Sequence, residues 1–290
     1  MIEKISSNVH RISAQDNLPL LIVSDIHFDS LHCDHESLKK HFDQIKEKNG
    51  KILIIGDLFD VMGCYKDPRS KAAHINPIYI QKGRSYLDLV VEDCYEFLKP
   101  YKENLALISY GNHEMSILKH RDTDPLERLV FLLNQSGETV HKGAYAGWVM
   151  CCLTRGGLNT RTFSIAYHHG KGGNAKRSKG ILYSQLDAME YPDANLIVSG
   201  HDHNKIYDPS NVRKRIDIRT GKTYKDTVHW LKTGSYAKSP EDFGWTVEKG
   251  FMAKRMGGWF VDLAYTRKNT AKEDIAYVEP TVYEAIPVRV

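Results

Sequence analysis

Three short apolar runs in the first half of the chain each end in polar residues, and this pattern narrows the choice of fold more than any other feature. They occupy residues 18–25, 51–57 and 105–112. The intervals 36–48 and 85–98 between them have the spacing of apolar and polar residues that is typical of amphipathic helices. Buried strands that alternate with helices predict β-α-β units and a parallel sheet in this half.

The second half has shorter strand-like runs, at 147–154, 161–168 and 195–199. A helix-like interval covers 178–190, and the segments 213–218 and 226–231 flank a glycine-containing turn, which predicts a β-hairpin. We expect a single domain over residues 1–290, with a strand-rich part from about residue 204.

The composition is that of a globular chain, with 41% hydrophobic and 26% charged residues and a net charge of +4. A disordered polyelectrolyte is excluded, and the positive excess is too small to predict a nucleic-acid partner by itself. No apolar run reaches the roughly 18 residues of a membrane span, and no signal peptide is evident. We therefore expect a cytoplasmic protein without membrane contact. The five cysteines form no CxxC pair, which disfavours a disulfide framework or a thiolate zinc site.

Side chains suited to metal binding recur where these strand-like runs end. The motifs are Asp25-Ile-His27, Gly56-Asp57-Leu-Phe-Asp60, Gly111-Asn112-His113-Glu114, His168-His169-Gly170 and Gly200-His201-Asp202-His203. The carboxyl ends of parallel strands meet at one edge of a sheet, so residues far apart in sequence can converge there. Any one of these pairs is weak, but the five together, with glycines that permit tight turns, predict a metal site.

In this order the motifs resemble those of the calcineurin-like metallophosphoesterase superfamily, over residues 24–203. The resemblance implies an α/β fold, a four-layer α/β/β/α metallophosphoesterase sandwich, with two divalent ions at its mouth. One ion would be held by Asp25, His27, Asp57 and His203. The other would be held by Asp57, Asn112, His169 and His201, which makes Asp57 the bridge.

The same resemblance assigns catalytic roles to His113 and Asp60. His113 matches a histidine that is not a ligand and would donate a hydrogen bond to the phosphoryl oxygen or a proton to the leaving group. Asp60 would orient His113, although an aspartate at this place can also cap a local turn. Asn112 and Lys171 are candidate substrate contacts.

The donors in this set are imidazole, carboxylate and amide groups, with no thiolate, and such donors favour transition-metal ions over Ca²⁺. We expect two divalent ions, with Mn²⁺ first and Fe, Zn²⁺, Co²⁺ or Ni²⁺ as alternatives. The implied reaction is attack of a metal-activated hydroxide on phosphorus, in line with the leaving group.

Several other residues are expected to have packing roles. His168 lies on the opposite strand face from His169, and the aromatic side chains of Trp245, Trp259 and Tyr265 are expected in the core. The cluster of His32, Cys33 and His35 has no fourth ligand paired with it and is expected to pack in a loop.

Departures from dedicated phosphatases favour a phosphodiesterase that acts on nucleic acid or nucleotides. Serine/threonine phosphatases of the superfamily follow the second motif with Arg-Gly, where this chain has Val61-Met62, and purple acid phosphatases have a tyrosine in place of Asp60. The basic segments 66–71 and 171–179 are candidates for contact with substrate phosphates. The alternatives are a phosphomonoesterase acting on a small molecule or phosphoprotein, and a non-catalytic scaffold, which the full set of matched ligands disfavours.

Segments 32–34, 65–71 and 234–251 also resemble calcineurin-like phosphoesterases encoded by bacteriophages and prophages. This resemblance concerns origin and leaves the substrate, the pathway and the oligomeric state open.

Overall fold

Apolar residues on the central strands alternate between two faces, and both faces are buried. In β4 (Lys51–Ile55), Ile52 and Ile54 pack toward helices, whereas Leu53 and Ile55 pack toward another sheet, to which β4 does not belong. Successive side chains of a strand point to opposite faces, so a strand that is buried on both sides lies between two layers.

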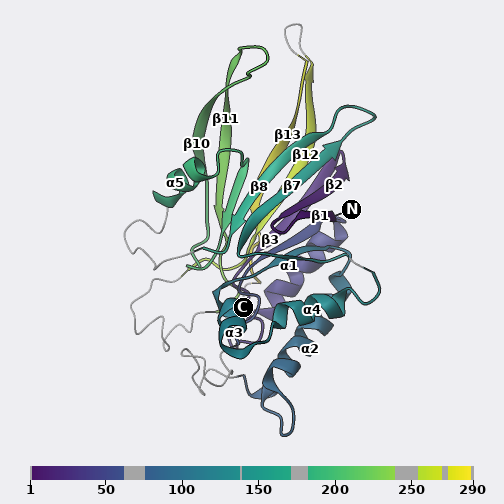
Figure 1. Ribbon diagram of the computed structural model, residues 1–290. Coiled ribbons are helices and arrows are strands. Elements are labelled where there is room, and N and C mark those ends of the chain that lie inside the picture. The colour runs from purple at the N-terminus through teal and green to yellow at the C-terminus, as the bar shows by residue number, and fades with distance from the viewer. Residues whose placement is uncertain are drawn as a thin grey trace.

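The computed structural model describes residues 2–61, 76–137, 139–170, 182–238, 254–269 and 274–288. Within these ranges two mixed sheets face one another (Figure 1). The first has the strand order β1 (Ile2–Ser6), β2 (Val9–Gln15), β7 (Ala146–Thr154), β8 (Arg161–His168), β9 (Leu196–Ser199), β11 (Thr223–Lys232) and β10 (Ile206–Ile216). The second has the order β13 (Asp274–Glu284), β12 (Trp259–Asn269), β3 (Asn17–Val23), β4, β5 (Leu105–Ser109) and β6 (His141–Gly143).

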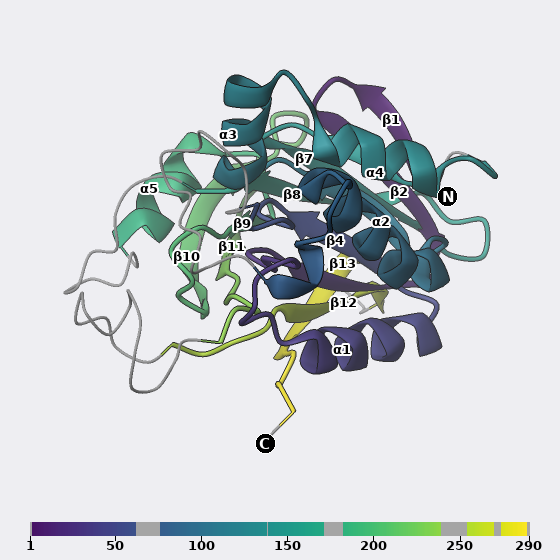
Figure 2. The ribbon, with the colours of Figure 1, turned by 90° about the horizontal axis from the view of Figure 1, so that it is seen from below.

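Helices cover the outer faces of the two sheets. α1 (His35–Glu47), α2 (Tyr86–Leu98) and α4 (Pro125–Leu133) pack on the second sheet, α3 (Asn112–Arg121) follows β5, and α5 (Leu182–Glu190) packs beside β10 and β11. Figures 1 and 2 both show α5 on the opposite side of the molecule from α1, α2 and α4. The predicted four-layer α/β/β/α sandwich is confirmed. In the described part of the chain, none of the helices is long and apolar enough to span a membrane.

The predicted elements correspond to those observed. The runs 18–25, 51–57 and 105–112 contain the parallel strands β3, β4 and β5, and the predicted helices 36–48 and 85–98 are α1 and α2. The predicted hairpin is formed by β10 and β11, in which Arg213 pairs with Asp226. Trp259 and Tyr265 lie in the core between the sheets, as predicted, and Trp245 falls outside the described residues.

The second sheet departs from the predicted parallel arrangement. β12 pairs with β3 in the antiparallel direction, and β13 pairs with β12 in the same manner. These two strands come from the C-terminal end of the chain and complete a sheet that begins at residue 17. A pairing between segments so distant in sequence has no local sequence signal, which is why the prediction omitted it.

The topology brings the carboxyl ends of two sets of strands to one end of the sandwich. β3, β4 and β5 are parallel to one another in the second sheet, and β8 and β9 are parallel in the first. The turns that follow them are joined by main-chain hydrogen bonds, from Asp25 N–H to the Gly56 carbonyl (3.1 Å) and from Gly200 N–H to the His169 carbonyl (2.9 Å). The five sequence motifs occupy these turns.

Candidate metal centre

The backbone of the strand-end turns is left-handed at several residues other than glycine. Asp25, His27, Asp57, His201 and His203 have φ angles of 51°, 50°, 48°, 72° and 57°. Such a conformation is unfavourable for residues with a Cβ and persists only where the surrounding structure enforces it. In this chain it occurs at five of the seven predicted ligands, where it redirects the chain as each strand ends.

Two glycines allow these turns to approach one another. A Cβ on Gly111 would lie 2.1 Å from Asp57 Oδ1, and a Cβ on Gly56, whose φ is 76°, would lie 2.4 Å from His169 Nδ1. No larger residue fits either position without displacing a predicted ligand. The glycines of the second and third motifs are therefore required by close contact.

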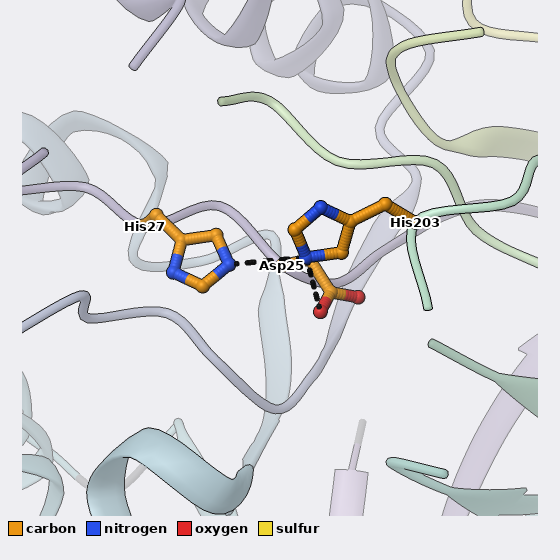
Figure 3. A group of neighbouring side chains, drawn as sticks. All are labelled: Asp25, His27 and His203. Atoms are coloured by element: carbon orange, nitrogen blue, oxygen red, sulfur yellow. Dashed lines mark hydrogen bonds and ion pairs between the residues drawn. The ribbon is translucent and has the colours of Figure 1, made fainter. Parts of the chain in front are cut away.

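The first group of potential ligands is formed by Asp25, His27 and His203 (Figure 3). His203 Nε2 lies 3.3 Å from Asp25 Oδ1 and 3.4 Å from His27 Nε2. The Asp25 carboxylate is fully buried and accepts the backbone N–H of His201 at 2.9 Å. The three donor atoms face a common point, as an ion would require.

The second group is formed by Asp57, His169 and His201. Asp57 Oδ2 lies 3.1 Å from His169 Nε2, while Asp57 Oδ1 accepts the backbone N–H of His113 at 2.9 Å. The amide oxygen of Asn112 lies 2.7 Å from His201 Nδ1 and 3.1 Å from His169 Nε2. All four residues predicted for the second ion are therefore neighbours.

Asp57 belongs to a further group of potential ligands, with His27 and His113. The Asp57 carboxylate thus lies within 4.8 Å of a nitrogen of His27 in one group, and within 4.8 Å of nitrogens of His169 and His201 in the other. The structure brings together the seven residues predicted as ligands, and it adds His113 at 3.8 Å from Asp57 Oδ2.

The histidine rings are oriented by hydrogen bonds made at one of their two nitrogens. Nδ1 of His169 donates to the carbonyl oxygen of Ile55 at 2.9 Å, and Nδ1 of His113 donates to that of Asp60 at 2.6 Å. In each ring this assignment leaves Nε2 directed toward the centre. Fixing one ring nitrogen in this way is the usual means of presenting the other to an ion or a substrate.

Carboxylates dominate the electrostatics of the centre. Burial disfavours charge on His27, yet the carboxylates of Asp60 and Asp57 raise its pKa to about 9. Burial acts the same way on His169, and Asp57 raises its pKa to about 10. Burial also opposes ionisation of Asp57, but His113 and His169 hold its pKa well below the usual value. The centre therefore attracts cations at neutral pH, whether protons or metal ions.

Asp60 contacts His27 through its carboxylate, and it makes its hydrogen bond with His113 through its main-chain carbonyl. Its carboxylate Oδ1 lies 3.1 Å from His27 Nδ1 and 3.6 Å from His113 Nδ1. The hydrogen bond to His113 is made instead by the main-chain carbonyl of Asp60. The predicted pairing of Asp60 with His113 is thus present as a contact, but the carboxylate itself lies closer to His27.

Sequence reasoning missed Asp29, which holds the Asp60 turn. The Asp29 carboxylate is 2% exposed and accepts the backbone N–H groups of Asp60 (2.6 Å) and Val61 (2.9 Å). It also accepts the hydroxyl of Tyr86, at the start of α2. The sequence did contain a signal for Asp29. It lies two residues after His27, just as His27 lies two residues after Asp25, so it continues the spacing of the first motif.

Glu114, the last residue of the third motif, supports the Asp57 turn, a role that the motif alone does not indicate. Its fully buried carboxylate accepts the backbone N–H groups of Asp57 (3.1 Å), Phe59 (2.9 Å) and Gly111 (2.8 Å). Burial and the charge of Asp57 raise the pKa of Glu114 to about 7. One side chain thereby ties together the turns that carry two of the motifs.

Other candidates from the sequence lie elsewhere. Lys171 and the basic segments 66–71 and 171–179 fall outside the described residues. His168 belongs to none of the potential metal groups among the described residues and stacks against Tyr191, with ring centroids 6.4 Å apart. His35 contacts the carbonyl oxygen of Phe28, and none of the potential metal groups among the described residues includes His32, Cys33 or His35.

Comparison with known proteins assigns residues 18–205 to the family described as calcineurin-like phosphoesterase. No curated protein matches the chain. Among solved structures, GAP50, the anchor in the inner membrane complex of Plasmodium, is similar at 12% identity and a TM-score of 0.43, covering 94% of this chain and 90% of that chain. A metallophosphoesterase from Sphaerobacter thermophilus is similar at 12% identity and a TM-score of 0.33, covering 91% and 88%.

A protein of Streptococcus pneumoniae described as a predicted phosphoesterase is similar at 11% identity and a TM-score of 0.33, covering 93% of this chain and 100% of that chain. The resemblance to bacteriophage-encoded members stays a prediction.

Asp29→Asn is expected to lower the free energy of unfolding by about 1–3 kcal/mol, because the amide cannot accept all three hydrogen bonds. Tyr86→Phe is expected to cost about 0.5–1.5 kcal/mol. Urea denaturation measures both. The matched controls are Asp43→Asn and Tyr101→Phe, since Tyr101 donates to Asp43 at 2.6 Å in a pair away from the centre, where Asp43 is 41% exposed. Equal losses in the two pairs would contradict the role given to Asp29.

Proposed function

Because the chain belongs to the calcineurin-like phosphoesterase family, and is thus a metal-dependent phosphoesterase, we propose that it hydrolyses phosphodiesters of nucleotides or nucleic acid at a dinuclear centre. Members of the family generally bind two divalent metal ions. The observation that supports a shared centre most directly is the position of Asp57, which is within reach of potential ligands on both sides.

The donor set fits such ions. Imidazole nitrogens, two carboxylates and the amide of Asn112 converge without a thiolate, which suits Mn²⁺, Fe, Zn²⁺, Co²⁺ or Ni²⁺, and we propose Mn²⁺ as the first choice. Asp25, His27, Asp57 and His203 would hold one ion. Asp57, Asn112, His169 and His201 would hold the other. When bound, such ions polarise the phosphoryl oxygens and lower the pKa of water.

We propose His113 as the residue that assists the leaving group. Its Nδ1 is occupied by the Asp60 carbonyl, so Nε2 is the atom that can donate a proton or hydrogen bond toward the centre. His113 is 9% exposed and lies on the first turn of α3. Asp60 would act mainly on His27, whose Nδ1 its carboxylate contacts.

Preference for a diester is supported by the turn after Asp60. Val61, at the position where serine/threonine phosphatases have arginine, is fully buried in the helical layer and cannot clamp a phosphate dianion. Of the described cations near the last motif, Lys232 is paired with the Asp202 carboxylate and Lys254 donates to the Asp202 carbonyl. A singly charged diester makes less demand on such cations than a dianionic monoester.

Metal content tests the dinuclear proposal. Equilibrium dialysis of the metal-free protein with Mn²⁺ should give two ions per chain, and Asp57→Asn should reduce this to one or none. Affinity should rise with pH up to about 9 to 10, because the pKa is about 9 for His27 and about 10 for His169, and both must lose protons before they can ligate an ion. A pH-independent affinity, or two ions retained by Asp57→Asn, would exclude this arrangement.

His113→Ala should keep both ions and lower kcat by roughly 10² to 10⁴-fold, the range for a positioned acid or base. His120→Ala, an exposed histidine on the same helix, is the matched control and should keep full activity. Asp60→Asn retains the carbonyl that orients His113, so its main effect should be weaker Mn²⁺ binding through His27. If His113→Ala removed an ion, His113 would be a ligand.

Bis(p-nitrophenyl) phosphate should be hydrolysed with a higher kcat/KM than p-nitrophenyl phosphate in Mn²⁺, since buried Val61 offers no charge to a dianion and Lys232 and Lys254 already contact Asp202. Release of p-nitrophenolate measures both reactions. Preference for the monoester, with no cleavage of DNA or RNA, would instead indicate a small-molecule phosphatase.

A further inference from the structure

A cavity of about 200 Å³ adjoins the candidate metal centre on the side of α5. It lies between the end of β8, the turn after β9 and α5, and His201 forms part of its wall. His201 also belongs to the ligand group of Asp57 and His169, so a phosphoester bound at that group has the cavity beside it. We call this cavity the α5 pocket.

Aromatic side chains form much of the wall of the α5 pocket. The rings of His168 and Tyr191 are inclined by 25° to one another, and Tyr191 also packs edge to face on Trp148, at 5.8 Å between centroids. Trp230 is fully buried and its Nε1 donates to Asp187 at 2.8 Å. These contacts hold the wall in place, and aromatic faces favour flat rings or cations as neighbours.

The described residues that line the α5 pocket carry a net negative charge. Its lining contains three carboxylates, those of Asp187, Glu190 and Asp202, and one ammonium group, that of Lys232. Lys232 is paired with Asp202, and Lys254 reaches the Asp202 carbonyl from outside the lining. Among the described residues, and with both lysines counted, one negative charge is left over, and the lining offers no lysine or arginine beside Asp187 and Glu190. Carboxylates in a partly closed site attract hydrogen-bond donors and repel anions.

We propose that the α5 pocket receives one of the two groups esterified to the phosphate of the substrate. This substituent carries hydrogen-bond donors and no negative charge of its own. This inference rests on the proposed function and narrows its substrate class. A nucleoside has this chemistry through its sugar hydroxyls and base, and an amino alcohol has it through its ammonium group. An internal nucleoside of a polynucleotide carries a second phosphate and is disfavoured, so a nucleic-acid substrate would place a terminal nucleoside in the pocket.

Three p-nitrophenyl phosphodiesters with the same leaving group test this proposal. They are the ester of thymidine 5′-phosphate, the same ester with an added 3′-phosphate, and the ester of phosphorylethanolamine. We expect kcat/KM for the thymidine ester to exceed that for its 3′-phosphorylated form by at least about tenfold, from repulsion by the pocket carboxylates. The ethanolamine ester distinguishes the two sources. A higher kcat/KM for the thymidine ester identifies a nucleoside as the occupant, and a higher kcat/KM for the ethanolamine ester identifies an ammonium group.

Variants of Glu190 separate binding in the pocket from general damage. Glu190 is exposed at the end of α5, so its replacement should not impair folding. Glu190→Gln should reduce the ratio of kcat/KM between the two thymidine esters, and Glu190→Lys should reduce it further. Glu96→Gln, an exposed glutamate on α2, is the matched control and should leave the ratio unchanged.

The inference fails if the wild-type protein hydrolyses bis(p-nitrophenyl) phosphate but shows equal kcat/KM for the two thymidine esters, or if Glu190→Lys leaves their ratio unchanged. The proposed function would then stand without the pocket. If none of the diesters were hydrolysed in the presence of Mn²⁺, the proposed function itself would be wrong, and the inference with it.

Discussion

A single buried carboxylate, that of Asp57, joins the two sides of the candidate metal centre. It is 2% exposed, and burying an unpaired charge would be costly. The cost is offset by the backbone N–H of His113 on one oxygen and by His169 on the other. The buried carboxylates of the centre also raise the pKa of His27 and of His169. The site is thus organised for positive charge before any ion binds.

The turns that present this carboxylate are held by a second set of buried carboxylates. Glu114 ties the Asp57 turn to the start of α3, and Asp29 ties the Asp60 turn to α2. Left-handed backbone at Asp25, His27 and Asp57 requires such support, because these residues would adopt other conformations in isolation. The α5 pocket continues the same pattern of negative charge away from the metal centre.

Much of the fold and most of the ligand set could be predicted because their signals are local. The apolar run 51–57 identifies a buried strand by itself, and Gly56 and Gly111 mark turns in which a Cβ would collide with a ligand. Pairing of β12 with β3 could not be predicted, since it joins distant segments through the main chain. The roles of Asp29 and Glu114 were missed for a related reason: each accepts backbone N–H groups, which every sequence has.

The central claim is that two ions share Asp57, and that His113 is not a ligand of either ion but acts on the substrate. Anomalous diffraction from crystals of the Mn²⁺-loaded protein tests it directly. We expect two peaks about 3.5–4 Å apart, as in other two-metal sites, one beside Asp25, His27 and His203 and the other beside His169 and His201. A single peak, or a peak within bonding distance of His113 Nε2 in the group with His27 and Asp57, would contradict the account.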